Sequence, residues 1–234
     1  PIPTVDEIMH RMNGSEVFSK IDLQNGFHQV ELSEKSREIT TFACHVGIFR
    51  YKRLLFGISS APELFQNIIQ QVMSRCKGVE NISDDLIIHG KDDCEHDSRL
   101  LKCIETLAKH GLTINKDKCL IRMSELEYFG HHVSGSGICP TQDRVKAVME
   151  ARPPKNSSEV RSFLGLVNFS AKFIPNLATI AEPLRKLTRS SCNFSWGSKE
   201  DQAFQMLKMS LNKAVKLAHF QKDAPTEIVV DASP

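Results

Sequence analysis

The sequence predicts an α+β fold in which an antiparallel sheet, with helices on one face, is followed by a helical segment. Up to about residue 140, short β-branched runs bounded by turn residues alternate with runs of helical apolar spacing. From residue 141 onward only helical spacing recurs, and the proline-containing stretch 152–155 marks the boundary between the two halves. The 234 residues are enough for one large or two modest domains.

The first part of the chain begins with a helix. Residues 3–13 predict a short amphipathic helix, because their apolar residues recur at helical spacing. Strand patterns follow in four runs: 16–22, 27–32, 40–44 and 48–52. The first of these strands ends at Asp22, and Gly26 allows a tight backbone between the first and the second.

Two helices enclose a hairpin in the middle of the chain. Ser60 is a good N-cap for the first helix, and Glu63 would complete a capping box with it. Residues 79–90 then read as strand, tight turn and strand. A second helix is predicted over about 92–110, and Gly111 ends it.

The remaining elements change from strands to helices. Strand-like runs are found at 112–114, 119–121 and 126–131, and a Gly-Ser-Gly turn follows at 135–137. Asn156 with Glu159 gives a second capping box, and Ser198 can cap the last helix. The apolar spacing predicts three main helices here: 156–167, 177–187 and 198–211.

Three carboxylates are the candidate catalytic residues. Asp84 and Asp85 lie in the turn of the predicted hairpin, and Asp22 ends another strand. Aspartate also suits a turn for purely local reasons, so a polar hairpin tip is the simpler explanation of the pair. If the two strands are neighbours, however, three carboxylates converge and need cations to offset their repulsion. Hard oxygen ligands suit magnesium, and such sites perform two-metal nucleotidyl transfer.

The composition excludes several protein classes. A content of 41% hydrophobic and 25% charged residues is ordinary for a globular protein. No apolar run is long enough to cross a membrane, and no signal peptide is visible. The seven cysteines include no C-x-x-C pair, so neither a disulfide framework nor a zinc site is expected. We expect a reducing, intracellular location, in a cytoplasmic particle or the nucleus.

The net charge of +2 conceals an asymmetry. Residues 151–222 carry 12 Lys and Arg against 4 Asp and Glu, a balance of +8, whereas the preceding part of the chain is mildly acidic. A basic surface is the electrostatic pattern expected for nucleic-acid binding. A merely solvated helical surface explains the same charges about equally well.

The order and spacing of several motifs carry a resemblance. Residues 16–234 resemble the reverse transcriptase region of gypsy-type LTR retrotransposon polyproteins. The matching motifs are Phe18 to Leu23 with Gly26 to Gln29, Leu55-Phe56-Gly57 with Ala61-Pro62 and Phe65-Gln66, Ser83-Asp84-Asp85, Gly111-Leu112 with Asn115, Lys118 and Cys119, Phe129-Gly130-His131 with Ser134, and Ser162 to Leu166 with Phe169 and Phe173-Ile174.

The resemblance implies a domain layout and an activity. Residues 1–139 would be the polymerase palm with partial fingers, 140–190 a helical thumb and connection, and 191–234 a connection leading to the first strand of a truncated RNase H-like domain. The activity would be RNA-directed DNA polymerisation with two Mg²⁺ ions, or Mn²⁺ in their place. The implied partners are an RNA or DNA template with its primer, a dNTP, and the rest of the polyprotein: upstream fingers, downstream RNase H and integrase. No membrane is implied.

The resemblance also assigns roles to individual residues. Asp22, Asp84 and Asp85 would be catalytic and hold the metal ions. The nucleotide would contact Leu23, Asn25, Gly26, Phe27, Phe56, Gly57 and Lys118, with the ring of Phe27 excluding a ribose 2′-hydroxyl. The primer grip would be Phe129, Gly130 and His131, and Asp231 would belong to an incomplete RNase H site.

The chain departs from the family pattern in ways that leave alternatives open. Ile82 stands where the paired-aspartate motif usually has a tyrosine, and the chain begins after the family's basic fingers residues. A decayed palm that binds nucleic acid without polymerising is therefore a second hypothesis; a nucleotide cyclase would leave the thumb-like segment unexplained. We expect residues 1–234 alone to bind a primer–template duplex but to extend it poorly, since catalysis requires the triphosphate to be held in line.

Overall fold

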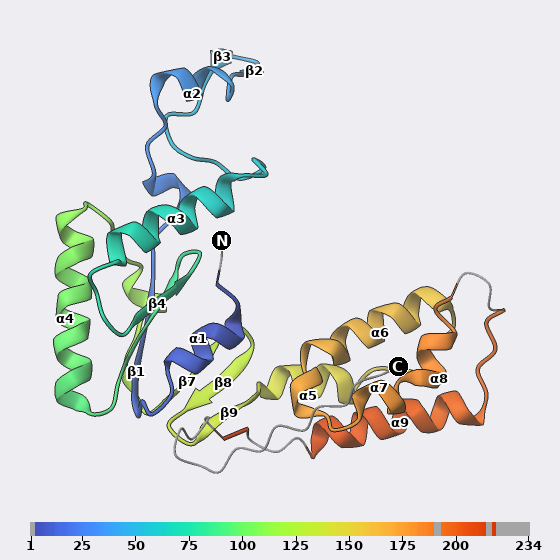
Figure 1. The fold of residues 1–234 in the computed structure, drawn as a ribbon. Coiled ribbons are helices and arrows are strands. Elements are labelled where there is room, and N and C mark those ends of the chain that lie inside the picture. Colours follow the sequence, from blue (N-terminus) through green and yellow to red (C-terminus); the bar gives the residue numbers. More distant parts are fainter. Residues whose placement is uncertain (1–2, 190–192, 214–216, 219–234) are drawn as a thin grey trace, which may run out of the picture.

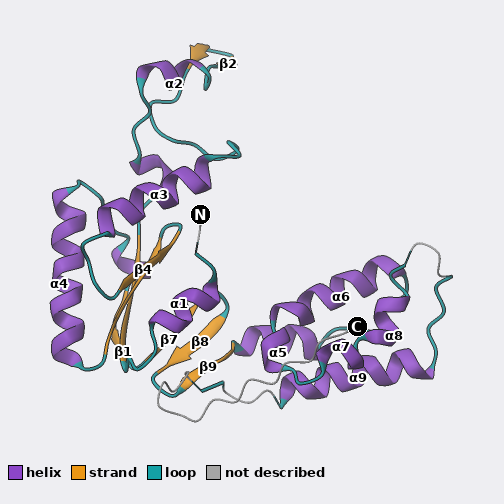
Figure 2. Ribbon diagram, in the orientation of Figure 1, coloured by secondary structure: helices purple, strands orange, loops and turns teal. Residues whose placement is uncertain are grey.

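The computed structural model describes residues 3–189, 193–213 and 217–218, and it confirms the predicted α+β fold. Figure 1 shows a sheet-containing part, against which α3 and α4 lie, and a separate group of helices beside it. Figure 2 shows that the strands are confined to the first part and that helices make up the second. Among the described helices, none combines the length and apolar character needed to cross a membrane.

A four-stranded antiparallel sheet forms the centre of the first part. Its order is β4–β5–β1–β6, so that β1 lies between two strands that come much later in the sequence. The strands are β1 (Val17–Asp22), β4 (Val79–Ile82), β5 (Asp85–Gly90) and β6 (Leu120–Met123). The register pairs Val17 with Gly90 at one end and Asp22 with Asp85 at the other.

Alternate residues of a strand point to opposite faces of the sheet, and the central strands β1 and β5 have buried residues on both faces. Ile21 and Leu86 pack with α3 (Ala61–Met73) and α4 (Asp93–Lys109). Phe18 and Ile87 point the other way, into a cluster with α1 (Val5–Arg11) and the small sheet described below. Burial on two sides explains why the central strands read as nearly continuous apolar runs.

Smaller elements surround the sheet. They are the short helices η1 (Gly26–Gln29), α2 (Glu34–Glu38) and η2 (Lys116–Lys118), the hairpin β2 (Phe42–Cys44) and β3 (Gly47–Phe49), and the three-stranded sheet β7 (Glu125–Tyr128), β8 (His131–Ser134) and β9 (Gly137–Pro140).

Three sequence-based predictions in this part are wrong. The strand expected from Phe27 is the 3-10 helix η1, because the left-handed Asn25 turns the chain and the Phe27 ring is anchored by Phe56 and Phe65. The strand expected through 126–131 breaks at Phe129 and Gly130, which both have positive φ. Residues 112–114 form no strand and contribute one isolated bridge to Leu23.

The helical part has a core of its own. Its elements are α5 (Gln142–Met149), α6 (Ser157–Phe169), η3 (Ala171–Phe173), α7 (Leu177–Ile180), α8 (Glu182–Lys186) and α9 (Ser198–Asn212). Buried residues from Val148 to Leu211 form one cluster, so the expected boundary between 190 and 191 crosses a shared hydrophobic core. Trp196 packs against this core and is 5.8 Å from the Phe204 ring.

The helix caps predicted from the sequence are confirmed only in part. Asn156 Oδ1 accepts a 2.9 Å hydrogen bond from the Glu159 amide, which confirms this cap. The Ser60 side chain makes no capping bond, because its backbone is already helical, so the predicted capping box with Glu63 is wrong. Gly197, one residue earlier than predicted, is the N-cap of α9.

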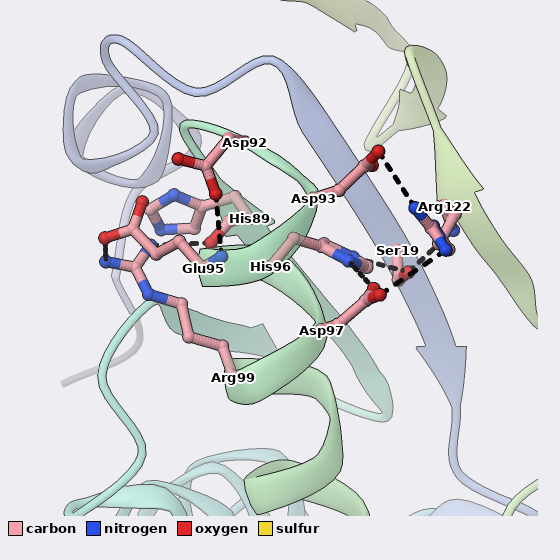
Figure 3. A network of polar contacts seen from close by, with 9 residues as sticks. All are labelled: Ser19, His89, Asp92, Asp93, Glu95, His96, Asp97, Arg99 and Arg122. Atoms are coloured by element: carbon pink, nitrogen blue, oxygen red, sulfur yellow. Dashed lines mark hydrogen bonds and ion pairs between the residues drawn. The ribbon is translucent and has the colours of Figure 1, made fainter.

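A buried polar network fixes β1 against α4 and β6. Figure 3 shows Ser19, whose hydroxyl lies 2.8 Å from His96 Nε2, while His96 Nδ1 lies 3.0 Å from Asp97. The Arg122 amide donates to Ser19 Oγ, where the register between β1 and β6 shifts. The order Ser–His–Asp is that of a nucleophilic triad, but Ser19 is 0% exposed, so this network holds the strand and has no access to a substrate.

Two other buried histidines make stability depend on pH. Burial, with Arg99 nearby, lowers the pKa of His89 to about 4, and burial, with Lys172 and Arg144 nearby, lowers the pKa of His131 to about 4. Both side chains are therefore neutral in the folded state at pH 7. The contribution of the two neutral histidines to the free energy of unfolding is complete above pH 6.5. It is lost as the pH falls toward 4, because the unfolded chain then binds protons that the folded chain does not.

We therefore expect the free energy of unfolding to decrease on acidification from pH 7 to pH 5, by roughly 2 kcal/mol for each of the two histidines. Urea titrations at intervals of half a pH unit measure this change. A His131→Gln variant should lose about half of the pH dependence. A free energy that stays constant between pH 7 and pH 5 would show that neither histidine is held neutral.

Candidate active site

A pocket of about 390 Å³ lies where β1 ends beside the turn between β4 and β5. The paired strands bring Asp22 next to this turn, and the Leu23 amide donates a 2.9 Å hydrogen bond to the Asp84 carbonyl. Eight of the sequence-predicted site residues line the pocket, and three further residues complete it: Asp22, Leu23, Gln24, Asn25, Gly26, Phe27, Phe56, Ser83, Asp84, Asn115 and Lys118.

Asp22 and Asp84 are the two carboxylates of this pocket. The Asp22 side chain is 13% exposed, whereas Asp84 is exposed at the tip of the turn. Lys118 Nζ lies 3.7 Å from Asp22 Oδ2, and its side chain is largely exposed. The pocket therefore presents two carboxylates and one ammonium group to a molecule that enters it.

Asp85 is placed differently. Its carboxylate forms a 3.0 Å ion pair with Lys20, two residues before Asp22 on β1, and it does not line the pocket. Burial raises the pKa of Asp85, and Lys20 opposes that effect. The strand register places Asp85 opposite Asp22, and the charges of Asp84 and Asp22 also raise the Asp85 pKa, so the three carboxylates lie near one another. Asp22 and Asp84 line the pocket, whereas Asp85 is paired with a lysine that the sequence analysis did not single out.

The walls of the pocket combine close backbone with aromatic rings. Gly26 lies so near Asp84 that an added Cβ would come within 3.5 Å of the Asp84 Cβ. The Gly26 amide is directed at the Leu23 carbonyl, 3.4 Å away. Phe27 contacts the pocket with one side of its ring and packs 5.2 Å from Phe65 with another, so it is both a core residue and a wall residue.

Of the two adjacent residues Phe56 and Gly57, which were both predicted to contact the nucleotide, only Phe56 lines the pocket. Phe56 is 67% exposed, lines the pocket and lies 5.0 Å from the Phe27 ring. Gly57 has a φ of +90°, an added Cβ would have no atom within 4 Å, and the residue does not line the pocket. Its contribution is the turn that precedes α3, which a residue with a side chain would strain.

Comparison with known proteins gives the family. Residues 1–133 match a family model described as reverse transcriptase (RNA-dependent DNA polymerase). The Tf2-3 transposon polyprotein of Schizosaccharomyces pombe is 31% identical over 235 residues, covering 100% of this chain, and the Tf2-7 polyprotein is 30% identical over the same length. The chain belongs to the reverse transcriptase family. It spans 18% of the length of these polyproteins.

Solved reverse transcriptase structures have the same fold. The foamy viral protease–reverse transcriptase in complex with dsDNA has a TM-score of 0.87 and 25% identity, covering 96% of this chain and 48% of that one. The same protein in complex with an RNA/DNA hybrid has a TM-score of 0.84 and 25% identity, covering 96% of this chain and 31% of that one. The resemblance read from the motifs of this reverse transcriptase chain is thus confirmed at the level of family and fold.

The donor set of this reverse transcriptase pocket can be tested against the metal that the family implies. Among the described residues, no group of three or more His, Cys, Asp or Glu side chains is close enough to hold an ion. Magnesium, however, usually binds proteins through one or two carboxylates together with substrate phosphates and water. Asp22 and Asp84 fit that requirement, since both line one open pocket.

Gln66 is a functional residue that the sequence reasoning quoted in a motif but gave no role. It is 1% exposed on α3, and its side chain bridges the two sides of the turn between β4 and β5. Its Nε2 donates a 2.9 Å bond to the Asn81 carbonyl, and its Oε1 accepts a 2.7 Å bond from the Ser83 amide. The clamp supports Ser83 in a left-handed conformation, with φ of 55°. A buried Gln five residues after the start of an otherwise apolar helix face was the available signal.

Replacing Gln66 by Leu should weaken both fold and activity. Two backbone groups would lose their partners, which costs about 1–3 kcal/mol of stability for each buried group left unpaired. The turn that carries Asp84 would also move, so nucleotide addition should fall more than the folded fraction does. Denaturant unfolding and primer extension measure the two effects, and Gln71→Leu on the exposed side of α3 is the matched control. Wild-type stability in Gln66→Leu would contradict the clamp.

The predicted primer-grip residues lie in the turn between β7 and β8 (Phe129 and Gly130) and at the start of β8 (His131), on a different sheet from Asp22 and Asp85. Phe129 is 37% exposed and Gly130 has a φ of +70°, so the turn presents one ring and a close backbone. His131 packs inward instead, since it is 4% exposed and stacks on Phe169. Direct primer contact by His131 is therefore not supported. Asp231 lies outside the described residues.

Proposed function

We propose that this region is the polymerase part of a gypsy-type LTR retrotransposon reverse transcriptase, which adds deoxynucleotides to a primer on an RNA or DNA template. The observation that carries the proposal is one pocket, in a chain of this family, lined by Asp22, Asp84 and Lys118 at the end of two paired strands. A structural neighbour that has been solved in complex with dsDNA and with an RNA/DNA hybrid supports a duplex as the partner.

Five side chains of the pocket have a task in this proposal. Asp22 and Asp84 would hold the divalent ions, and Lys118, whose Nζ lies 3.7 Å from Asp22, would bind a phosphate of the incoming dNTP. Phe56 and Phe27 flank the sugar and base. When bound, magnesium neutralises the triphosphate and lowers the pKa of the primer hydroxyl. The protein's contribution is positioning and charge, which provide most of the catalysis in phosphoryl transfer.

The position of Lys20 gives Asp85 an indirect task. The ion pair keeps a negative charge close to the metal-binding pair while restraining the carboxylate outside the pocket. A third unneutralised carboxylate at this point would raise the repulsion between Asp22 and Asp84. We infer that Asp85 shapes the field of the pocket and that Asp22 and Asp84 supply its inward-facing oxygens.

Wider features of the polyprotein follow from the same proposal. The basic balance of residues 151–222 supports contact with the duplex phosphates. A following RNase H domain that includes Asp231, preceding basic fingers and an intracellular particle are proposed from the family resemblance. The curated relatives, being polyproteins, are consistent with further domains on either side.

Templated primer extension tests the proposal. The chain, alone and joined to the segments that flank it in such polyproteins, is given a DNA primer on an RNA template with Mg²⁺ and one dNTP at a time. We expect the joined form to add only the complementary nucleotide and the chain alone to extend the primer poorly, and we expect both forms to bind the duplex with an affinity that falls steeply with salt. Binding without any templated addition, in the joined form as well, would favour a decayed palm that binds nucleic acid.

A further inference from the structure

The turn between β7 and β8 is in direct contact with the helical part through Arg144 of α5. An added Cβ on Gly130 would overlap the Arg144 guanidinium, with Cζ only 2.6 Å from it. The glycine therefore leaves room for the Arg144 guanidinium beside the turn. Its φ of +70° independently requires a residue that tolerates the left-handed region.

The same guanidinium covers an aromatic ring of the next helix. Arg144 Cζ lies 3.4 Å from the centroid of Phe169, at the end of α6. A planar guanidinium at this distance combines cation–π attraction with flat stacking, which lysine cannot reproduce. Within 3–189, 193–213 and 217–218, Arg144 has no ion pair or side-chain hydrogen bond, and its guanidinium lies near Gly130 and over the Phe169 ring.

A second contact joins the same two elements. The ring of His131, directly after Gly130, stacks on Phe169 with a centroid distance of 5.2 Å and an angle of 21°. His131 also lies 5.8 Å from the buried Phe173. Lys172 then connects this corner to α1 through a 2.7 Å ion pair with Asp6. The turn and the residue after it thus contact the helical part in two ways, through Arg144 beside Gly130 and through the His131–Phe169 ring pair.

We propose that Arg144 is a positioning residue, which holds the turn at Phe129 and Gly130 in a fixed orientation relative to α6 and so keeps a bound primer end in place between chemical steps. The inference rests on the proposed polymerase function. Arg144 is far in sequence from the pocket and does not line it. Its loss should therefore loosen the grip on the duplex and leave the chemistry at Asp22 and Asp84 intact.

The variants separate positioning from charge. Arg144→Met keeps a long side chain and removes the positive charge. Arg144→Lys keeps the positive charge and removes the planar guanidinium group. Lys146→Met is the matched control, because it removes one positive charge from the same helix at an exposed residue that forms an ion pair with Glu150. The thermal unfolding curve of each variant is measured first, to show that the variant is folded at the temperature of the assays.

In Arg144→Met we expect the duplex to dissociate roughly three- to tenfold faster and the number of nucleotides added per binding event to fall by the same factor. The rate of single-nucleotide addition at saturating duplex should stay within about twofold of wild type. Arg144→Lys should be intermediate, and Lys146→Met should match wild type. Equal defects in Arg144→Met and Lys146→Met would overturn the proposal.

The salt dependence of duplex affinity decides between positioning and direct phosphate contact. A side chain that contacts a phosphate contributes about one unit to the slope of log affinity against log salt, whereas a positioning residue leaves the slope unchanged. We expect Arg144→Met to keep the wild-type slope. A slope reduced by about one would identify Arg144 as a phosphate contact and would contradict its positioning role.

Hydrogen exchange without nucleic acid tests the inference independently of the proposed function. Amides of residues 129–132 should exchange faster in Arg144→Met, while those of β1 and β5 should be unchanged. Unchanged exchange in the turn would overturn the positioning role even if the enzyme polymerises. Absence of templated addition by the wild-type protein would instead defeat the proposed function, and the exchange result would still stand.

Discussion

The Asp84→Asn variant is expected to lose templated nucleotide addition by roughly a thousandfold or more, because a preorganised charge at the reaction centre is removed. The amide keeps the shape of the side chain but lacks the anionic charge that magnesium requires. Asp84 is exposed at the tip of the turn, so its replacement removes no buried contact. The measurement is single-nucleotide extension with Mg²⁺ in the polyprotein context, together with an unfolding curve.

Asp117→Asn is the matched control for this prediction. Asp117 is an exposed aspartate in η2, one residue before the pocket residue Lys118, and it does not line the pocket. We expect it to extend primers at close to the wild-type rate. Near wild-type activity in Asp84→Asn would refute the assignment of this carboxylate, whereas loss of activity in both variants would point to a general effect of charge.

The second large effect concerns the choice between deoxyribonucleotides and ribonucleotides. Phe27→Val should raise ribonucleotide incorporation relative to deoxyribonucleotide by roughly tenfold or more, because removing the ring opens space for a 2′-hydroxyl. The ring lines the pocket between Gly26 and Phe56 and is held by Phe65 behind it. A competition assay with both nucleotides present measures this ratio directly and does not depend on the folded fraction.

Phe65→Leu is the control for packing. Phe65 is 0% exposed and supports Phe27 from the core, so its replacement lowers stability by cavity formation without removing the ring at the pocket. We expect the nucleotide ratio of Phe65→Leu to change much less than that of Phe27→Val. An unchanged ratio in Phe27→Val would show that Phe27 is a core aromatic only.

The position of the candidate site could be predicted from the sequence because it depends on strand ends and a turn. Asp22 ends an apolar β-branched run, and the Asp84–Asp85 pair separates two others, so antiparallel pairing of these runs brings the carboxylates to one edge. Family motifs then gave Lys118, Phe56 and Gly26, which the structure places around the same pocket.

Contacts between residues that are far apart in the sequence could not be predicted, because they depend on how the elements pack in three dimensions. The Lys20–Asp85 ion pair crosses from β1 to β5, and its lysine reads as an ordinary strand residue. The clamp of Gln66 on Asn81 and Ser83 joins a helix to a turn. Residues 27–32 alternate like a strand, but aromatic packing of Phe27 and the left-handed Asn25 override this local pattern.

The central claim is that Asp22 and Asp84 face one pocket that holds a divalent ion with a triphosphate. Iron-mediated backbone cleavage tests it most directly: Fe²⁺ replaces Mg²⁺ in the presence of a dNTP, and the cut positions are mapped. We expect cuts near residues 22–26 and 83–85, suppressed by excess Mg²⁺ and absent in Asp84→Asn. Cuts confined to other parts of the chain, or cuts that persist in Asp84→Asn, would contradict the account.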